Sequence, residues 1–219
     1  MSVSISVSNL ELYRMWRASD DLDLPWLLRR LSGEEPQTEA MAAGEALHQA
    51  LERSTLGETG QLWTADYRFY FKCDCSVELP QARELRVQKE YGDLVVRGRV
   101  DALIGKRVID YKTTSHWDPD RLMAGYQWRY YLDMLDADEF SWQVFVMSQF
   151  GDFAEAGRLV HAYEIYQVHE LSQRRYDDLE HDCDKLAQDF LAFARELDRS
   201  GYEWRRLDAS SLPPAEAVR

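Results

Sequence analysis

Cysteine is scarce in this chain, and the scarcity argues against a small secreted protein held together by disulfides. Only three cysteines occur among 219 residues, at positions 73, 75 and 183, and their odd number and spacing do not form a disulfide framework. Cys73 and Cys75 lie two residues apart on a predicted strand, so both would point to one face. Zinc pairs more often have two or more residues between the cysteines. We interpret the two as ordinary strand cysteines, with a zinc pair as the alternative.

Long apolar runs are also missing. No run reaches the roughly 18 apolar residues of a transmembrane helix, so no membrane span is predicted. The first residues, MSVSISVSNLELY, lack the basic and apolar segments of a signal peptide. The chain is nevertheless 45% apolar and 12% aromatic, which is enough for a sizeable core. We expect a cytoplasmic protein with one domain over residues 1–206 and a flexible tail over 207–219.

Positive charge is in short supply, which by itself argues against a nucleic-acid partner. The chain has 26 Lys and Arg against 39 Asp and Glu, a net charge of −13. The charge is unevenly distributed, because residues 95–132 are net +3, with 7 basic and 4 acidic side chains, whereas residues 1–94 are net −6 and residues 133–219 are net −10. This positive segment indicates a local site for an anionic ligand. Chance variation over a short segment is the alternative.

Helical spacing of apolar residues predicts N-terminal helices within residues 8–53. The first helix is expected to begin at Ser8 or Asn9, either of which is a suitable N-cap, and the next two to begin at Pro25 and Thr38. These helices contain the first candidate functional residue.

That residue is His48, which lies four positions after Gly44 on the third helix, so the two share a helical face close to the apolar one. Glycine lowers helix stability, so its presence indicates close approach of another segment. His48 considered alone is most simply a hydrogen-bonded histidine at the margin of the core. A functional role for it depends on which residues lie near it in the fold.

Alternating apolar residues predict strands across a core at residues 62–168. The expected strands are 62–79, 84–91, 94–104, 107–112, 140–150 and 159–168, with a helix from Pro119 to about Leu135. A Gly92-Asp93 turn and a Gly105-Lys106 turn are short, so the strands that they join are antiparallel neighbours.

Charged residues on the two central strands are unusual, because a charge removed from water must be paired or must hold a metal. Asp101 lies on the first strand and can lie beside Asp110 on the second. Lys112 shares a face with Asp110, whereas Tyr111 points the other way. Two carboxylates suit a hard divalent cation, and a lysine beside them suits a phosphate. The pattern therefore indicates a metal and a phosphate.

Beyond the core, residues 170–200 are predicted to form one long helix. Its apolar residues are spaced alternately by three and four, which is a heptad pattern: Tyr176, Leu179, Cys183, Leu186, Phe190, Phe193 and Leu197. A cysteine and two phenylalanines are unusual in a coiled coil. We expect this helix to pack on the domain, with an oligomer interface as the alternative.

With these motifs in place, the chain resembles the PD-(D/E)XK nuclease superfamily, and specifically its RecB-like branch. The resemblance covers about residues 8 to 131, beginning with Ser-Asn-Leu-Glu-Leu-Tyr, and an Asp-Xaa-Lys motif alone would be weak evidence. The motifs occur in the family's order: Gly44-Glu45-Ala46-Leu47-His48, Gly98-Arg99-Val100-Asp101, Ile109-Asp110-Tyr111-Lys112-Thr113, and Gln127 with Tyr131.

The resemblance implies an α/β fold with a restriction-endonuclease-like mixed central sheet flanked by helices. It implies Mg²⁺ or Mn²⁺ held by His48, Asp101, Asp110 and the Tyr111 carbonyl, with Lys112 positioning or activating water. Gln127 and Tyr131 would contact DNA. Some relatives have an acid on the preceding strand that reaches the metal, and Glu90 lies on that strand here. A solvated strand glutamate is the alternative. Arg99 and Arg121 are further candidate DNA contacts.

The function implied is a metal-dependent DNA exonuclease of recombination, repair or phage DNA metabolism, in a bacterium or a phage-infected cell. A separate recombinase, single-strand-binding protein or helicase is an expected partner because no Walker motif is present, and a homo-oligomer is a further expectation. An iron–sulfur cluster is not expected, because Met15 and Trp16 replace the N-terminal cysteine of cluster-containing relatives. A structure-specific or restriction-type endonuclease and a non-catalytic DNA-end-binding protein are the alternatives.

Overall fold

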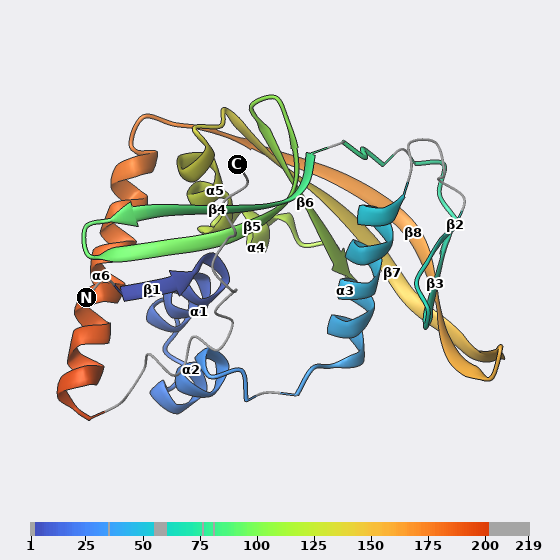
Figure 1. Cartoon of the computed structure of the whole chain (residues 1–219), viewed down its shortest axis with the longest axis horizontal. Helices are drawn as coiled ribbons and strands as arrows, with labels where there is room; N and C mark the ends of the chain where they lie inside the picture. Colours follow the sequence, from blue (N-terminus) through green and yellow to red (C-terminus); the bar gives the residue numbers. More distant parts are fainter. Residues whose placement is uncertain (1–2, 35, 55–60, 76, 81, 202–219) are drawn as a thin grey trace, which may run out of the picture.

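The computed structural model describes residues 3–34, 36–54, 61–75, 77–80 and 82–201. These residues form an α/β fold in which a mixed eight-stranded sheet is flanked by helices (Figure 1). The order along the sheet is β1-β5-β6-β7-β8-β3-β2, and β4 pairs with β5 off this path. The strands are β1 (Val3–Ser6), β2 (Gln61–Trp63), β3 (Tyr67–Phe71), β4 (Ala82–Tyr91), β5 (Leu94–Ile104), β6 (Arg107–Thr114), β7 (Glu139–Glu155) and β8 (Arg158–Arg174).

Helices cover both faces of the sheet and bury two separate apolar clusters. The helices are α1 (Val7–Arg17), α2 (Leu24–Leu31), α3 (Glu39–Arg53), α4 (Pro119–Ala124), α5 (Gln127–Leu135) and α6 (Leu179–Arg199). Successive strand residues point to opposite faces, so Val108 enters the cluster beneath α1, α5 and α6, whereas Ile109 enters the cluster beneath α3. The central strand β6 consequently places apolar side chains on both faces of the sheet.

The central strands agree with the sequence expectation. β5 has the predicted bounds, and both short turns join antiparallel neighbours, with β4 pairing to β5 and β5 to β6. Gly92 and Gly105 have positive φ angles of 59° and 57°, a region that glycine enters without the steric cost of a Cβ. Local turn chemistry was therefore sufficient to predict this part of the sheet.

The N-terminus differs from the prediction. The first helix begins at Val7 rather than after Ser8 or Asn9, because Ser6 is the N-cap and its Oγ accepts the Asn9 N–H at 3.1 Å. Residues 3–6 form a strand that pairs in parallel with β5, with Ser6 opposite Arg97. This pairing places the start of α1 next to β5.

Four other predicted elements have different bounds. The helix expected over 119–135 is two helices, because Gly125 is extended, with ψ of 160°, and separates α4 from α5. The strands expected to end at residues 150 and 168 continue to Glu155 and Arg174 as β7 and β8, whose hairpin projects beyond the helices in Figure 1. The final helix starts at Leu179 instead of residue 170, because β8 continues to Arg174.

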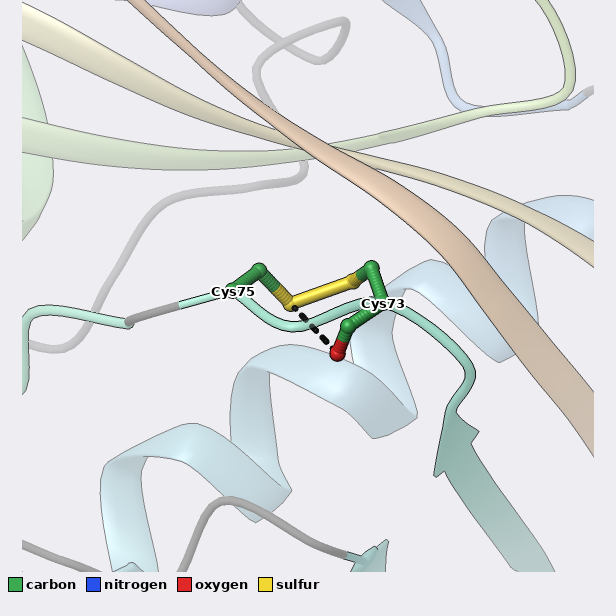
Figure 2. The surroundings of a disulfide bond; sticks show 2 residues. All are labelled: Cys73 and Cys75. Atoms are coloured by element: carbon green, nitrogen blue, oxygen red, sulfur yellow. Dashed lines mark hydrogen bonds between the residues drawn. A yellow bond between two sulfur atoms is a disulfide. The ribbon is translucent and has the colours of Figure 1, made fainter.

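The cysteine prediction was wrong. Cys73 and Cys75 are joined by a disulfide in the segment after β3 (Figure 2). The sheet strand ends at Phe71, so the two residues are not part of the extended strand predicted over 62–79. Their Cα atoms are 5.4 Å apart, within the range that a disulfide spans. Cys183, the other cysteine, is a buried free thiol.

The heptad pattern of the last helix faces the domain, as expected. Leu179, Cys183, Leu186 and Phe190 of α6 are buried in the same cluster as Tyr13 of α1 and Tyr130 of α5. The tail prediction for residues 207–219 lies outside the described residues. Within the described residues, no helix is long and apolar enough to cross a membrane.

Candidate functional site

The two candidate acids lie where β5 and β6 separate. The ladder between these strands ends at the pair Ala102 and Ile109, and the next residue on each strand is an acid, Asp101 on β5 and Asp110 on β6. β6 instead continues its pairing with β7, with Asp110 opposite Trp142. The separation leaves room for side chains and ligands at the point where the two carboxylates lie.

Asp101 is held by one main-chain and one side-chain contact. Its Oδ2 accepts the Tyr111 N–H at 2.8 Å, which satisfies the amide that the separated ladder leaves without a partner on β5. The same oxygen lies 3.5 Å from Nδ1 of His48 on α3. This contact links α3 to β5.

Asp110 is the most deeply buried acid of the group, with 4% of its surface exposed. Its Oδ1 accepts hydrogen bonds from Lys112 Nζ at 3.1 Å and from Gln127 Nε2 at 3.2 Å. Its Oδ2 lies 2.8 Å from the Lys112 ammonium, yet accepts no hydrogen bond from any described residue. One buried carboxylate oxygen is thus left with unused acceptor capacity.

Burial and neighbouring charges shift the pKa values of the four ionisable residues in this cluster. Burial raises the pKa of Asp110 to about 6, against the opposing effect of Lys112. Burial alone would raise the pKa of Asp101, but His48, Lys112 and the Tyr111 amide lower it. Burial alone would lower the pKa values of His48 and Lys112, but the neighbouring carboxylates raise both. In each of the four groups, a neighbouring opposite charge therefore counteracts the effect of burial on the pKa.

A cavity of about 460 Å³ connects these groups. Its lining includes seven of the predicted site residues, contributed by α3, β5, β6 and α5: His48, Arg99, Asp101, Asp110, Lys112, Gln127 and Tyr131. Residues that are far apart in the sequence therefore converge on one volume. The remaining walls come from Arg97, Gly98 and the first residues of α1.

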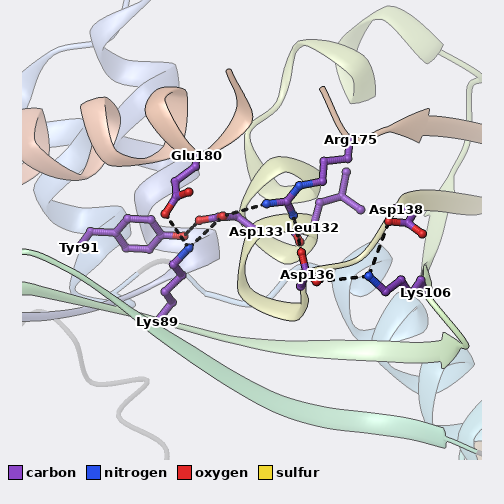
Figure 3. A network of polar contacts seen from close by, with 9 residues as sticks. All are labelled: Lys89, Tyr91, Lys106, Leu132, Asp133, Asp136, Asp138, Arg175 and Glu180. Atoms are coloured by element: carbon purple, nitrogen blue, oxygen red, sulfur yellow. Dashed lines mark hydrogen bonds and ion pairs between the residues drawn. The ribbon is translucent and has the colours of Figure 1, made fainter. Parts of the chain in front are cut away.

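The position of α5 depends on Tyr131 and on a buried acid behind it. The Tyr131 hydroxyl donates to the Arg99 carbonyl at 2.9 Å, which attaches α5 to β5 and orients Gln127 one turn earlier. On the other side of α5, Asp133 accepts hydrogen bonds from Tyr91 at 2.6 Å and Lys89 at 3.0 Å, and Arg175 lies 3.7 Å away (Figure 3). These contacts fasten α5 to β4 and to the segment before α6.

Two predicted residues do not join the cavity. Glu90 is exposed and lies opposite Val95, six residues along β5 from Asp101, or about 20 Å at the usual rise of a strand. Arg121 is exposed on α4 and is absent from the lining. Tyr111 directs its side chain into the α3 cluster, so its main chain alone faces Asp101. Arg99 lines the cavity but pairs with Glu84 at 2.8 Å.

Glu84 is an acid that sequence reasoning missed. It occupies the position on β4 that faces Asp101 on β5, between the pairs Arg83–Ala102 and Leu85–Val100. It has a φ of 54°, which is uncommon for a residue with a Cβ and often marks a functional position. Burial and the nearby Asp101 carboxylate raise its pKa, although Arg99 opposes them. Counting register back from Asp101 across the hairpin would have found it.

The donor set fits a hard divalent cation. Carboxylate oxygens suit Mg²⁺ and Mn²⁺, and the buried Oδ2 of Asp110 lacks a hydrogen bond. In the part of the chain that the structure describes, no group of three or more His, Cys, Asp or Glu side chains is positioned to hold a metal ion by itself. A cation would therefore use water and phosphate oxygens as further ligands, which is the usual habit of Mg²⁺.

Comparisons with known proteins give a fold and no family. No family model and no curated protein matches the chain. Among solved structures, the fold is similar to one described as "Crystal structure of SSO0001", with a TM-score of 0.50 and 18% identity. The similarity covers 88% of this chain and 77% of that one. At this identity the likeness supports the α/β architecture alone.

Proposed function

We propose that this protein is a metal-dependent nuclease of the PD-(D/E)XK type that hydrolyses phosphodiester bonds of DNA, acting as an exonuclease. The observation that carries the proposal is the convergence of Asp101, Asp110 and Lys112 on one cavity, together with His48 from α3 and Gln127 from α5. Clusters of buried acids beside a lysine have a high energetic cost without a ligand, so this arrangement is better explained by chemistry than by stability.

In the proposed mechanism, Asp101 and Asp110 would hold Mg²⁺ or Mn²⁺, and His48 would be a further ligand or would orient Asp101. When bound, the cation polarises the phosphate and lowers the pKa of the attacking water. The Tyr111 amide donates a hydrogen bond to the Asp101 carboxylate and fixes its orientation. The side chain therefore loses less conformational freedom when a cation binds.

Lys112 and Gln127 act on either side of Asp110 in this mechanism. The Lys112 ammonium neutralises Asp110 in the absence of DNA and stabilises negative charge that develops on the phosphate. It is a third exposed, so it is accessible to a substrate in the cavity. Gln127 holds Asp110 through its amide, and its place at the first residue of α5 brings that helix to the site.

The test is the cleavage of end-labelled linear duplex and closed circular DNA in Mg²⁺, in Mn²⁺ and in EDTA. We expect metal-dependent release of products from linear DNA, and a loss of at least about 100-fold in Asp110→Asn and Lys112→Gln, the size typical of removing a charge-stabilising group. Matched controls are Asp120→Asn and Lys185→Gln, which change exposed residues outside the cavity and should cleave like the wild type.

The alternatives have separate signatures in the same experiment. Nicking of closed circular DNA would identify an endonuclease. Binding of DNA ends without cleavage in either metal would identify a non-catalytic end-binding protein. Cleavage that survives in both Asp110→Asn and Lys112→Gln would exclude this site as the catalytic one.

A further inference from the structure

The cavity has a second charged end that the proposed chemistry does not use. Arg97 lies on β5 four residues before Asp101, and both residues line the cavity. Arg97 is partly buried and its Nε is shielded from solvent. Within the described residues, Nε has no hydrogen-bond partner and the guanidinium forms no ion pair.

This lack of a partner distinguishes Arg97 from the other arginines near the site. Arg99 pairs with Glu84, and Arg83 donates to a series of main-chain carbonyls that includes those of Leu51 and Ser54. A guanidinium has five N–H donors, and leaving a shielded charge unpaired is costly. Unsatisfied polar groups in a native structure often mark the place of a ligand.

The wall next to Arg97 also favours an anion. Ser6 lies opposite Arg97 in the β1–β5 register, and Ser6, Val7, Ser8 and Asn9 at the start of α1 line the same cavity. The first turn of this 11-residue helix contains no acidic residue. Main-chain N–H groups at a helix N-terminus carry a partial positive charge that attracts phosphate, so the helix adds to the charge of Arg97.

The separation of the two ends indicates two different phosphates. Four residues of β5 span about 13 Å between Arg97 and Asp101. Successive nucleotides of one strand are about 3.4 Å apart along the axis of a duplex, so a phosphate at Arg97 belongs to a different nucleotide from the one at Asp101.

We propose that Arg97, supported by the first turn of α1, is a second phosphate-binding subsite, which binds an unreacting phosphate of the nucleic-acid strand while Asp101, Asp110 and Lys112 act on the scissile one. This inference rests on the proposed nuclease function. The subsite sets which nucleotide is placed at the acids, because it fixes one point of the strand at a constant distance from them. Its ligand is either an internal backbone phosphate or a terminal 5′-phosphate.

The experiment compares wild type, Arg97→Gln and Arg97→Lys with a fluorescein-labelled duplex DNA that carries either a 5′-phosphate or a 5′-hydroxyl. Affinity is measured by anisotropy in EDTA over a range of salt concentrations, and KM and kcat are measured in Mn²⁺. Arg174→Gln is the matched control, because Arg174 is exposed on β8 and outside the cavity.

We expect Arg97→Gln to weaken binding and raise KM by about tenfold, the usual scale for loss of a hydrogen bond to a charged group, with a smaller effect on kcat. The slope of log Kd against log salt concentration should decrease by about one, the value expected for the loss of one phosphate contact. Arg97→Lys should recover part of the affinity. Thermal stability should be unchanged or higher, because the substitution removes an unpaired charge. A loss confined to the 5′-phosphate duplex identifies a terminal phosphate, and a loss on both identifies an internal one.

Equal Kd and equal KM for wild type and Arg97→Gln would overturn the inference and leave the nuclease proposal intact. A melting temperature that falls in proportion to the loss of affinity would also overturn it, because Arg97 would then be structural. A wild-type protein that neither binds nor cleaves DNA would overturn both proposals together.

Discussion

Gly98 and Tyr131 are in contact across the junction of β5 and α5, and the contact requires that residue 98 has no side chain. A Cβ built on Gly98 would lie 2.4 Å from Cε1 of Tyr131 and 3.1 Å from its hydroxyl oxygen. The Tyr131 ring therefore occupies the space of a missing side chain, and its hydroxyl reaches the Arg99 carbonyl at 2.9 Å. This contact positions the helix that carries Gln127.

The first prediction follows from that contact. Gly98→Ala should displace Tyr131 and lower the free energy of unfolding by about 1–3 kcal/mol, the usual cost of overpacking. Chemical denaturation measures the loss, and a DNA-cleavage assay should show reduced activity because Gln127 moves with α5. Gly151→Ala is the control, because a Cβ there meets no atom within 4 Å. A Gly98→Ala protein as stable and active as that control would contradict the prediction.

The second prediction concerns the glycine on the histidine-bearing helix. A Cβ on Gly44 would lie 2.8 Å from Oγ1 of Thr113 on β6, so the close approach expected from the sequence is made by a strand side chain. Glycine to alanine in an exposed helix should stabilise by about 1 kcal/mol, whereas Gly44→Ala should destabilise. Thr113→Ala removes the obstructing atom, so the double variant should recover stability. Additive effects of the two substitutions in denaturation would argue against the contact.

The third prediction tests the acid network behind α5. The Asp133 side chain is fully buried, and it accepts hydrogen bonds from Tyr91 and Lys89. Asp133→Ala should lower the free energy of unfolding by about 2–4 kcal/mol, because it leaves buried donors without their acceptor. Asp136→Asn, on the exposed side of the same network in Figure 3, should change it by less than about 0.5 kcal/mol. Equal effects of the two variants in urea denaturation would contradict this ranking.

The fourth prediction concerns the reactivity of Cys183. Burial raises the pKa of its thiol, so the reactive thiolate is suppressed at and above the ordinary cysteine pKa of about 8.5. With Cys73 and Cys75 joined in a disulfide, the native protein should react very slowly with a thiol reagent at pH 8. Unfolding in urea should expose one reactive thiol per chain. Rapid labelling of the native protein, located to Cys183 by mass spectrometry, would be inconsistent with its buried position.

The fifth prediction separates metal binding from catalysis. Mn²⁺ at about 100 times its dissociation constant should stabilise the protein by about 2.7 kcal/mol, seen as a rise in melting temperature that EDTA reverses. Asp110→Asn should lose most of this rise, because the buried Oδ2 with unused acceptor capacity is replaced. Asp120→Asn is the matched control. An unchanged rise in Asp110→Asn would place the cation elsewhere.

The sequence by itself was sufficient for the central hairpins, for the third helix with Thr38 as its N-cap, and for the proximity of Asp101, Asp110 and Lys112. These features depend on neighbours in the chain, such as glycine turns and residues of matching parity, so local pattern carries the information. Heptad spacing likewise predicted which face of the last helix is buried.

Only the tertiary structure decided which of the polar residues share a cavity. Arg97 and the start of α1 meet because a short parallel strand pairs with β5, and parallel pairing joins residues that have no local signal in common. The disulfide formed because the chain leaves the sheet after Phe71. The β1–β5 pairing joins distant segments, and the disulfide depends on where the pairing of β3 with the distant strand β8 ends, so neither follows from a local preference.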